Sequence, residues 1–191
     1  MTETGDMRRD EEVRERIAAD LQALRDEGRC SVRIVDAGCG DGAWLIWAAT
    51  RARTLGFTAI EAHGIDPSPA NVAKACANAA GVRDLAIGLT FAADDLPAAL
   101  AVEGAEPADL VLCLGGAFEV IPADRRPALA HTLARAGDKV LLAPSRVRRR
   151  ARALREIGKL LADCGGLVER VRVGAARAYR APVLLHLRPA R

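Results

Sequence analysis

The sequence predicts an α/β fold: a doubly wound, mostly parallel seven-stranded sheet with helices on both faces and a C-terminal antiparallel hairpin. Three observations support this prediction. β-like and helix-like segments alternate along the chain after residue 30, and a glycine-rich loop joins the first expected strand to the first helix that follows it. The last two expected strands have no helix between them, so they can pair only as antiparallel neighbours.

A local pattern accounts for each expected element. An apolar stripe in a charged segment predicts a helix over 8–27, and Gly28 is its expected stop. The expected strands are 32–36, 59–65, 86–91, 109–114, 138–143, 167–173 and 182–187. The expected helices between them are 43–54, 69–80, 96–102, 123–135 and 146–164. Residues 1–191 are therefore expected to form one domain, with the helix inside 1–30 as a candidate cover for its pocket.

The composition indicates an ordinary globular protein without a metal site. Half of the 191 residues are apolar and 28% are charged, so the chain can bury a substantial core. The five cysteines form no CxxC pair and the N-terminus is charged, so reduced thiols and a cytoplasmic location are expected. No apolar stretch approaches the roughly 20 residues that span a bilayer, so no membrane partner is expected. His63, His131 and His186 lack the spacing of metal ligands.

The glycine-rich loop runs from Asp36 to Gly42 and fits two kinds of cofactor. Its pattern formally satisfies the dinucleotide fingerprint, which would indicate a NAD(P)-binding oxidoreductase. However, Asp36 and Asp41 would repel a pyrophosphate, since two like charges about 4 Å apart repel by about 4 kcal/mol at an effective dielectric of about 20. The acids suit a ligand with a cationic amine or sulfonium and no phosphate. S-adenosyl-L-methionine (SAM) has that chemistry.

The pattern Asp36-x-Gly38-x-Gly40-x-Gly42 resembles the first motif of class I SAM-dependent methyltransferases. Three later segments resemble further motifs of that family, in the same order. They are His63-Gly-Ile-Asp66-Pro67, Leu89-Thr-Phe-Ala-Ala-Asp94-Asp95-Leu96 and Ala108-Asp109-Leu-Val-Leu-Cys-Leu114-Gly115-Gly116. Because the four segments together cover 32–116, this resemblance is more specific than a lone glycine loop. It also implies a sheet of seven strands that ends in a reversed hairpin.

The resemblance implies which residues bind SAM or its product, S-adenosyl-L-homocysteine (SAH). It assigns the methionine part to the glycine loop, the ribose hydroxyls to the acid that ends the second strand, and the adenine to the acids that end the third. Of those last two, Asp95 aligns better than Asp94 with the adenine-binding acid. The expected cofactor-binding residues are Asp36, Gly38, Cys39, Gly40, Gly42, Asp66, Pro67, Asp94, Asp95, Leu96 and Leu114.

The expected acceptor site lies past the end of the fourth strand, between Leu114 and Glu119. Methyl transfer from an activated sulfonium depends mostly on alignment, and a general base is needed only if the acceptor must lose a proton. Glu119 is the candidate catalytic base, although a solvent-facing acid at a helix start is its more ordinary interpretation. Trp44 follows the loop directly and can either contact the ligand or pack in the core.

The sequence leaves the methyl acceptor open and favours a small molecule. An RNA or protein acceptor is supported only by the arginine-rich segment 146–159, which a solvated helix face explains more simply. A protein that binds SAM without transferring its methyl group is a further alternative. The oligomeric state does not follow from the sequence.

Overall fold

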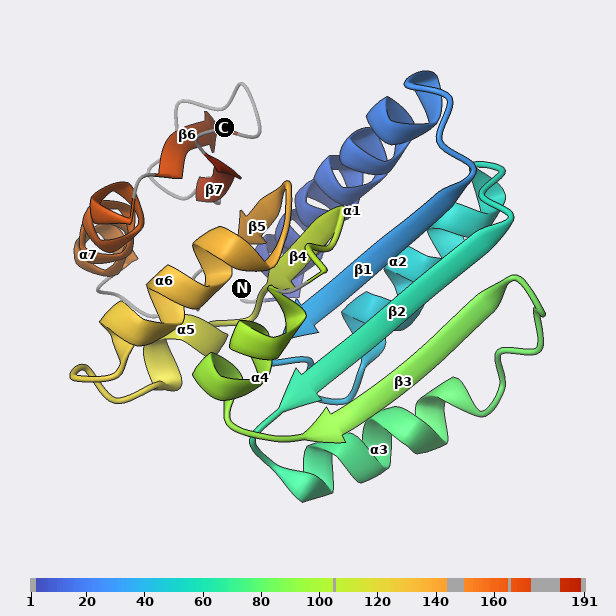
Figure 1. The fold of residues 1–191 in the computed structure, drawn as a ribbon, viewed down its shortest axis with the longest axis horizontal. Coiled ribbons are helices and arrows are strands. Elements are labelled where there is room, and N and C mark those ends of the chain that lie inside the picture. Colours follow the sequence, from blue (N-terminus) through green and yellow to red (C-terminus); the bar gives the residue numbers. More distant parts are fainter. Residues whose placement is uncertain (1–2, 105, 144–149, 165, 173–182, 190–191) are drawn as a thin grey trace.

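The structure is a computed structural model that describes residues 3–104, 106–143, 150–164, 166–172 and 183–189. Within them, one sheet has the strand order β3-β2-β1-β4-β5-β7-β6 (Figure 1). The strands are β1 Ser31–Ala37, β2 Ala59–Asp66, β3 Ile87–Ala93, β4 Leu110–Cys113, β5 Val140–Leu142, β6 Gly166–Arg172 and β7 Val183–Pro189. The helices are α1 Glu3–Asp26, α2 Ala43–Thr54, α3 Pro69–Ala79, α4 Leu96–Glu103, α5 Ala117–Val120, α6 Arg126–Ala136 and α7 Arg150–Asp163.

The five strands from β3 to β5 are parallel to one another. The predicted α/β class and the predicted parallel sheet with helices are therefore confirmed. At the β5 edge, β7 pairs antiparallel with β5, and β6 pairs antiparallel with β7. The turn of the expected C-terminal hairpin, at 173–182, lies outside the described residues.

The helix boundaries follow the predictions closely except around α5 and α6. The helix predicted over 123–135 starts only at Arg126, and the unexpected short helix α5 precedes it. Gly115 and Gly116 have φ values of +66° and +87°, and Gly116 is the N-terminal cap residue of α5. A helix of four residues is too short to show an apolar period, so its sequence resembles a loop. The N-terminal helix also begins earlier than predicted, at Glu3.

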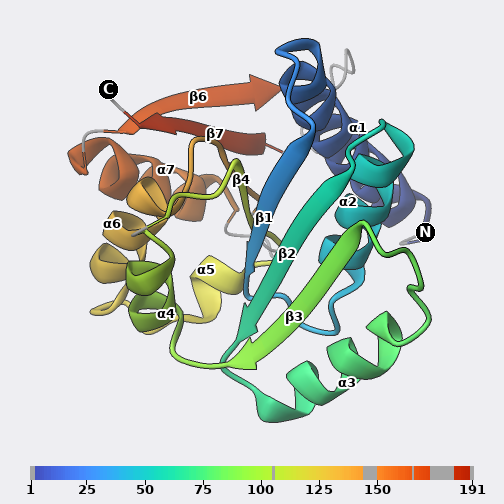
Figure 2. The same cartoon turned by 45° about the vertical axis from the view of Figure 1, so that its right-hand side comes forward.

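The helices cover both faces of the sheet (Figure 2). One core cluster joins α1 and α2 to their face of the sheet. A second cluster joins α4, α6 and α7 to the opposite face. Alanine, leucine and valine form most of both clusters, as the low aromatic content of the sequence requires. This two-sided packing leaves the strand ends as the places where a site can open.

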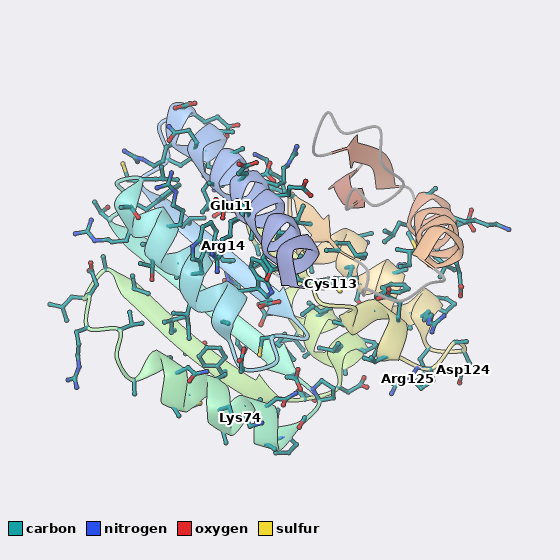
Figure 3. All side chains as sticks on the ribbon, turned by 180° about the vertical axis from the view of Figure 1, so that it is seen from behind. Glu11, Arg14, Lys74, Cys113, Asp124 and Arg125 are labelled. Carbon is teal, nitrogen blue, oxygen red and sulfur yellow. The ribbon has the colours of Figure 1, made fainter. Side chains whose placement is uncertain are left out.

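Helix α1 packs against α2. Its buried stripe includes Val13 and Ile17, and the Arg14 guanidinium lies 5.8 Å from the ring centre of Trp44 and 5.6 Å from that of Trp47 (Figure 3). Such cation–π contacts stabilise helix pairing by about 0.5–1 kcal/mol at exposed sites. Trp44 therefore contacts α1. In the described part of the chain, no helix is both long and apolar enough to cross a membrane.

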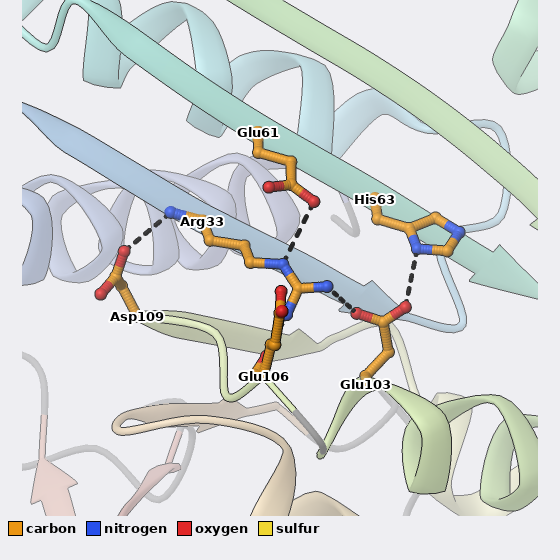
Figure 4. A network of polar contacts seen from close by, with 6 residues as sticks. All are labelled: Arg33, Glu61, His63, Glu103, Glu106 and Asp109. Atoms are coloured by element: carbon orange, nitrogen blue, oxygen red, sulfur yellow. Dashed lines mark hydrogen bonds and ion pairs between the residues drawn. The ribbon is translucent and has the colours of Figure 1, made fainter.

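Paired charges lie along the amino-terminal half of the sheet (Figure 4). The Arg33 guanidinium contacts the carboxylates of Glu61 and Glu103 at 3.2 and 2.7 Å. The other oxygen of Glu103 lies 3.0 Å from Nδ1 of His63. Glu103 is buried, but both of its oxygens have partners. This network ties β1 and β2 to the end of α4.

Asp109 is a second buried acid with partners at the same end of the sheet. One of its oxygens accepts a hydrogen bond from the Arg33 backbone N–H at 2.7 Å, and the other lies 2.7 Å from the Arg29 guanidinium. Because the backbone N–H and the guanidinium both stabilise the charged form, this carboxylate can be buried at little cost. Asp109 therefore helps to fix the amino end of β4 beside β1.

Candidate functional site

The glycine loop, Asp36 to Gly42, lies at the point where the strand order reverses. β1 is in the middle of the parallel strands, with β2 on one side and β4 on the other. Open parallel sheets bind ligands at such a point, outside the carboxyl ends of the strands. Gly38 and Cys39 donate backbone hydrogen bonds to the Ile65 carbonyl at 2.8 and 3.0 Å. The end of β2 thus holds the loop in place.

The three loop glycines serve different purposes, although all have positive φ. A Cβ on Gly38 would lie 2.3 Å from Cβ of Ala117, and one on Gly42 would lie 2.9 Å from Cε1 of Phe91. These two glycines are therefore required by packing inside the protein. A Cβ on Gly40 would meet nothing within 4 Å. Gly40 is thus the loop position where a ligand can approach the backbone.

Asp36 is the most unusual group at the site. It is only 1% exposed, and neither carboxylate oxygen accepts a hydrogen bond from any residue that the structure describes. Burial, with a smaller contribution from the charge of Asp66, raises the pKa of Asp36 from 3.8 to about 7. An unpaired buried carboxylate is costly in its charged form and is expected to serve a function.

Asp66, the last residue of β2, links the loop to α3. Its Oδ2 accepts a hydrogen bond from the Gly40 N–H at 2.9 Å. Its Oδ1 accepts from the Ser68 N–H at 2.9 Å and from the Asn71 side-chain amide at 3.1 Å. Asn71 was not predicted. Its position at the start of a helix, five residues after Asp66, is the signal in the sequence that could have indicated it. The neighbouring Pro67 is exposed.

The two acids after β3 differ in their hydrogen bonds and ion pairs. Asp95 caps α4 by accepting from the Ala98 N–H at 3.3 Å, and it forms an ion pair with Arg125 at 2.7 Å. Asp94 is exposed, and its carboxylate accepts only a hydrogen bond from the Asp95 N–H, at 2.7 Å, among the described contacts. Arg125, beside Asp124 in the segment between α5 and α6 (Figure 3), was not predicted, because no local pattern connects it with Asp95. Leu96 is buried in the core below the loop.

The end of β4 brings Glu119 toward the same region. Leu114 is buried, and the exposed Gly115 leads into α5, which carries Glu119. Burial raises the pKa of the Cys113 thiol, and the charges of Asp36 and Glu119 raise it further. Both acids therefore lie close to Cys113. Glu119 lies in the first turn of α5, as its more ordinary interpretation expects, but it is half-buried rather than fully exposed.

Two hollows in the described surface lie away from the glycine loop. One, of about 610 Å³, is at the amino ends of the strands and includes Arg29, Arg33 and Asp109. The other, of about 460 Å³, lies between α3 and β3. In the first hollow Arg29 pairs with Asp109 and Arg33 with Glu61, and the second has no charged residue in its lining. Among the described residues, no group of three or more His, Cys, Asp or Glu side chains is arranged to hold a metal ion.

The chain matches a family described as "Methyltransferase domain" over residues 34–138, which is more than half of its 191 residues. That match includes the glycine loop, Asp66, the acids after β3 and the end of β4. No protein of curated function matches the chain.

Solved structures with the same fold include three methyltransferases. The magnesium protoporphyrin IX methyltransferase (ChlM) of Synechocystis PCC 6803, solved with bound SAM, is 21% identical, with 94% of this chain and 80% of that chain covered and a TM-score of 0.61. The precorrin-6Y C5,15-methyltransferase of Geobacter metallireducens is 17% identical, with 94% and 88% covered and a TM-score of 0.59. The ribosomal protein L11 methylase of Lactobacillus delbrueckii subsp. bulgaricus is 21% identical, with 89% and 78% covered and a TM-score of 0.54.

At these identities the solved structures establish the fold, whereas the family match establishes the enzyme class. The NAD(P)-binding alternative for the glycine loop is not supported by either comparison. The chain therefore belongs to the class I SAM-dependent methyltransferases, enzymes whose methyl donor is S-adenosyl-L-methionine.

Proposed function

We propose that this methyltransferase transfers the methyl group of SAM to a small-molecule acceptor by in-line displacement. The observation that carries the proposal is the group of acids around the carboxyl ends of β1 to β4, with the unpaired Asp36 at its centre. This group suits the positive charges of SAM. It also disfavours a polyanion such as RNA, because binding RNA requires basic groups that neutralise phosphates.

The described residues fit the cofactor at two points. The unpaired carboxylate of Asp36 can accept hydrogen bonds from a cationic amine, and the open space at Gly40 allows close approach to the backbone. Around them, Gly38, Cys39 and Gly42 shape the loop that would hold the methionine part. These assignments support the prediction that the glycine loop binds the charged end of the cofactor.

The remaining residues proposed to bind the cofactor are assigned mainly to its ribose and its adenine. Asp66 is proposed to accept the ribose hydroxyls, with the exposed Pro67 beside it. Among the described contacts, its Oδ2 accepts one hydrogen bond, from the Gly40 N–H. For the adenine amino group, Asp94 is the better candidate, because Asp95 already caps α4 and pairs with Arg125. Leu96 and Leu114 are proposed as the apolar surfaces beside the adenine and the methionine part.

The catalytic contribution of the chain is mainly alignment. SAM supplies an already activated methyl group, and fixing donor and acceptor in line contributes up to about 7–11 kcal/mol. Glu119 is proposed to take a proton from the acceptor if the acceptor must lose one. A base role predicts that Glu119→Gln lowers kcat and shifts its pH profile while cofactor affinity stays unchanged.

An RNA or protein acceptor is the second candidate for this site. Its support was the arginine-rich segment 146–159, whose first residues and side chains up to Arg155 lie outside the described ones. The named relatives act on a porphyrin, a precorrin and a ribosomal protein, so they do not decide the acceptor. Binding of total RNA that weakens steeply with salt would favour the macromolecular acceptor and contradict our proposal.

The first test is calorimetric titration of the protein with SAH, and with NAD⁺ as a control. Micromolar binding of SAH and no heat with NAD⁺ is the expected result. A methyl-transfer assay against a panel of small acceptors, ribosomal proteins and total RNA then tests the acceptor class. Transfer only to the macromolecules would overturn the small-molecule assignment and leave the cofactor assignment intact.

A further inference from the structure

We propose that binding of the cationic cofactor releases one proton from Asp36, so that the site binds SAM and SAH more tightly as the pH rises toward neutrality. This inference rests on the proposed function, because it requires the positively charged end of the cofactor to lie near Asp36. It concerns the regulation of that site by pH.

The first support is the position of Asp36 within the sheet. It is paired in register with Gly64 of β2 and Leu112 of β4, so it lies between two parallel neighbours in the sheet. It is 1% exposed, and both of its oxygens are without a donor from the described residues. A carboxylate in such a place is stable only when it is neutral or when a cation comes close to it.

The second support is that no described cation offsets the effect of burial on Asp36. The charge of Asp66, at the end of β2, raises the pKa of Asp36, and the charge of Asp36 in turn raises the pKa of Cys39 in the glycine loop and of Cys113 in β4. Burial raises the pKa of Cys39 to about 12, so this thiol stays neutral through the physiological range. Burial likewise raises the pKa of Cys113. No cation among these neighbours stabilises the charged form of Asp36.

The consequence follows from charge balance. With its pKa raised to about 7, the Asp36 carboxyl is mostly protonated below neutral pH when the site is empty. SAM brings a sulfonium and an ammonium, and SAH brings an ammonium; both also carry the α-carboxylate of their amino-acid part. Because the ammonium is proposed to lie nearer to Asp36 than that carboxylate does, either ligand favours the ionised form of Asp36. The displaced proton passes to the buffer. Below about pH 6, affinity is therefore expected to weaken about tenfold per pH unit.

The experiment is calorimetry of SAH binding in two buffers that differ in ionisation enthalpy. The dependence of the observed heat on the buffer gives the number of protons released. From a pKa of about 7, the release should be about 0.9 protons at pH 6 and about 0.5 at pH 7. The Asp36→Asn variant keeps the shape of the side chain and cannot release a proton, so its proton release should vanish.

Two controls separate Asp36 from other sources of protons. The amino group of the ligand itself titrates, with a reference pKa of about 8, and subtracting the Asp36→Asn result removes its contribution. Asp41→Asn removes an equal charge from an exposed position in the same loop, so it should leave the proton release unchanged. Glu119→Gln should also leave it unchanged.

The outcomes distinguish this inference from the proposed function. SAH binding with no proton release between pH 5.5 and 7 would overturn the inference and leave the proposed function intact. Proton release that persists in Asp36→Asn and disappears in Glu119→Gln would overturn the assignment to Asp36. No binding of SAH or SAM at any pH would contradict the proposed function itself.

Discussion

Two buried acids of the same sheet have opposite surroundings. Asp109, at the amino end of β4, accepts a backbone N–H and pairs with Arg29. Asp36, at the carboxyl end of β1, is still more deeply buried and has no such donors among the described residues. Glu103 resembles Asp109, because Arg33 and His63 satisfy both of its oxygens (Figure 4).

The difference indicates which groups serve the fold and which serve a ligand. Acids at the amino ends of the strands have their partners within the chain, as Asp66 has at the carboxyl end of β2, so removing one of them should reduce stability. Asp36 lacks such partners among the described residues, so removing it should affect binding and leave stability unchanged or improved. The following substitutions test this contrast.

The largest effect is expected within the glycine loop itself. Gly38→Ala should destabilise the protein by about 1–3 kcal/mol through overpacking against Ala117, and by about 1–2 kcal/mol more through its positive φ. Gly40→Ala has room for its Cβ, so only the backbone cost applies to its stability. Urea unfolding of the two variants measures the difference. Equal destabilisation would show that Gly38 is not required for packing.

The next effect concerns the paired acid. Asp109→Ala should lower the free energy of unfolding by about 1.5–3 kcal/mol, because the buried Arg33 N–H loses a charged acceptor. Asp36→Asn, a change at a still more deeply buried acid, should cost nothing at pH 7. Urea unfolding at pH 7 compares the two. A larger loss for Asp36→Asn than for Asp109→Ala would contradict the contrast between the paired and the unpaired acid.

The smallest effect, taken per pH unit, is a dependence of stability on pH in the absence of ligand. Since the folded pKa of Asp36 is raised to about 7 and its unfolded value is near 3.8, the unfolded chain loses this proton first as the pH rises. The free energy of unfolding should therefore fall with a slope of about 1.4 kcal/mol per pH unit between about pH 4 and 7. Thermal unfolding of the wild type and Asp36→Asn measures this slope. An identical pH dependence in both proteins would contradict the raised pKa.

The sequence predicted the parts of the site that local patterns determine. The glycine loop, Asp66 at the end of β2 and the span of α2 follow from a strand, a turn and a helix that are adjacent in the chain. The short α5 could not be predicted, because four residues show no period. The half-buried position of Glu119 depends on that helix and was missed with it.

Local sequence patterns also could not predict contacts between segments that are distant in the chain. The ion pair of Asp95 with Arg125, whose members are 30 residues apart, is the reason that Asp94 rather than Asp95 is proposed for the adenine. The close approach of Gly38 to Ala117 and the network around Arg33 depend on the tertiary fold in the same way. The sequence predicts that Asp36 belongs to the cofactor site, and the structure adds that its carboxylate lacks a partner among the described residues.

The most direct test of the central claim, that Asp36 is left unpaired for the cationic cofactor, is the affinity for SAH measured by calorimetry at pH 7.5 in the wild type and in Asp36→Asn. A charged hydrogen-bond partner contributes about 1.5–3 kcal/mol, so the substitution should weaken binding by about 10-fold to 150-fold without loss of stability. Equal affinity in the two proteins would contradict the claim.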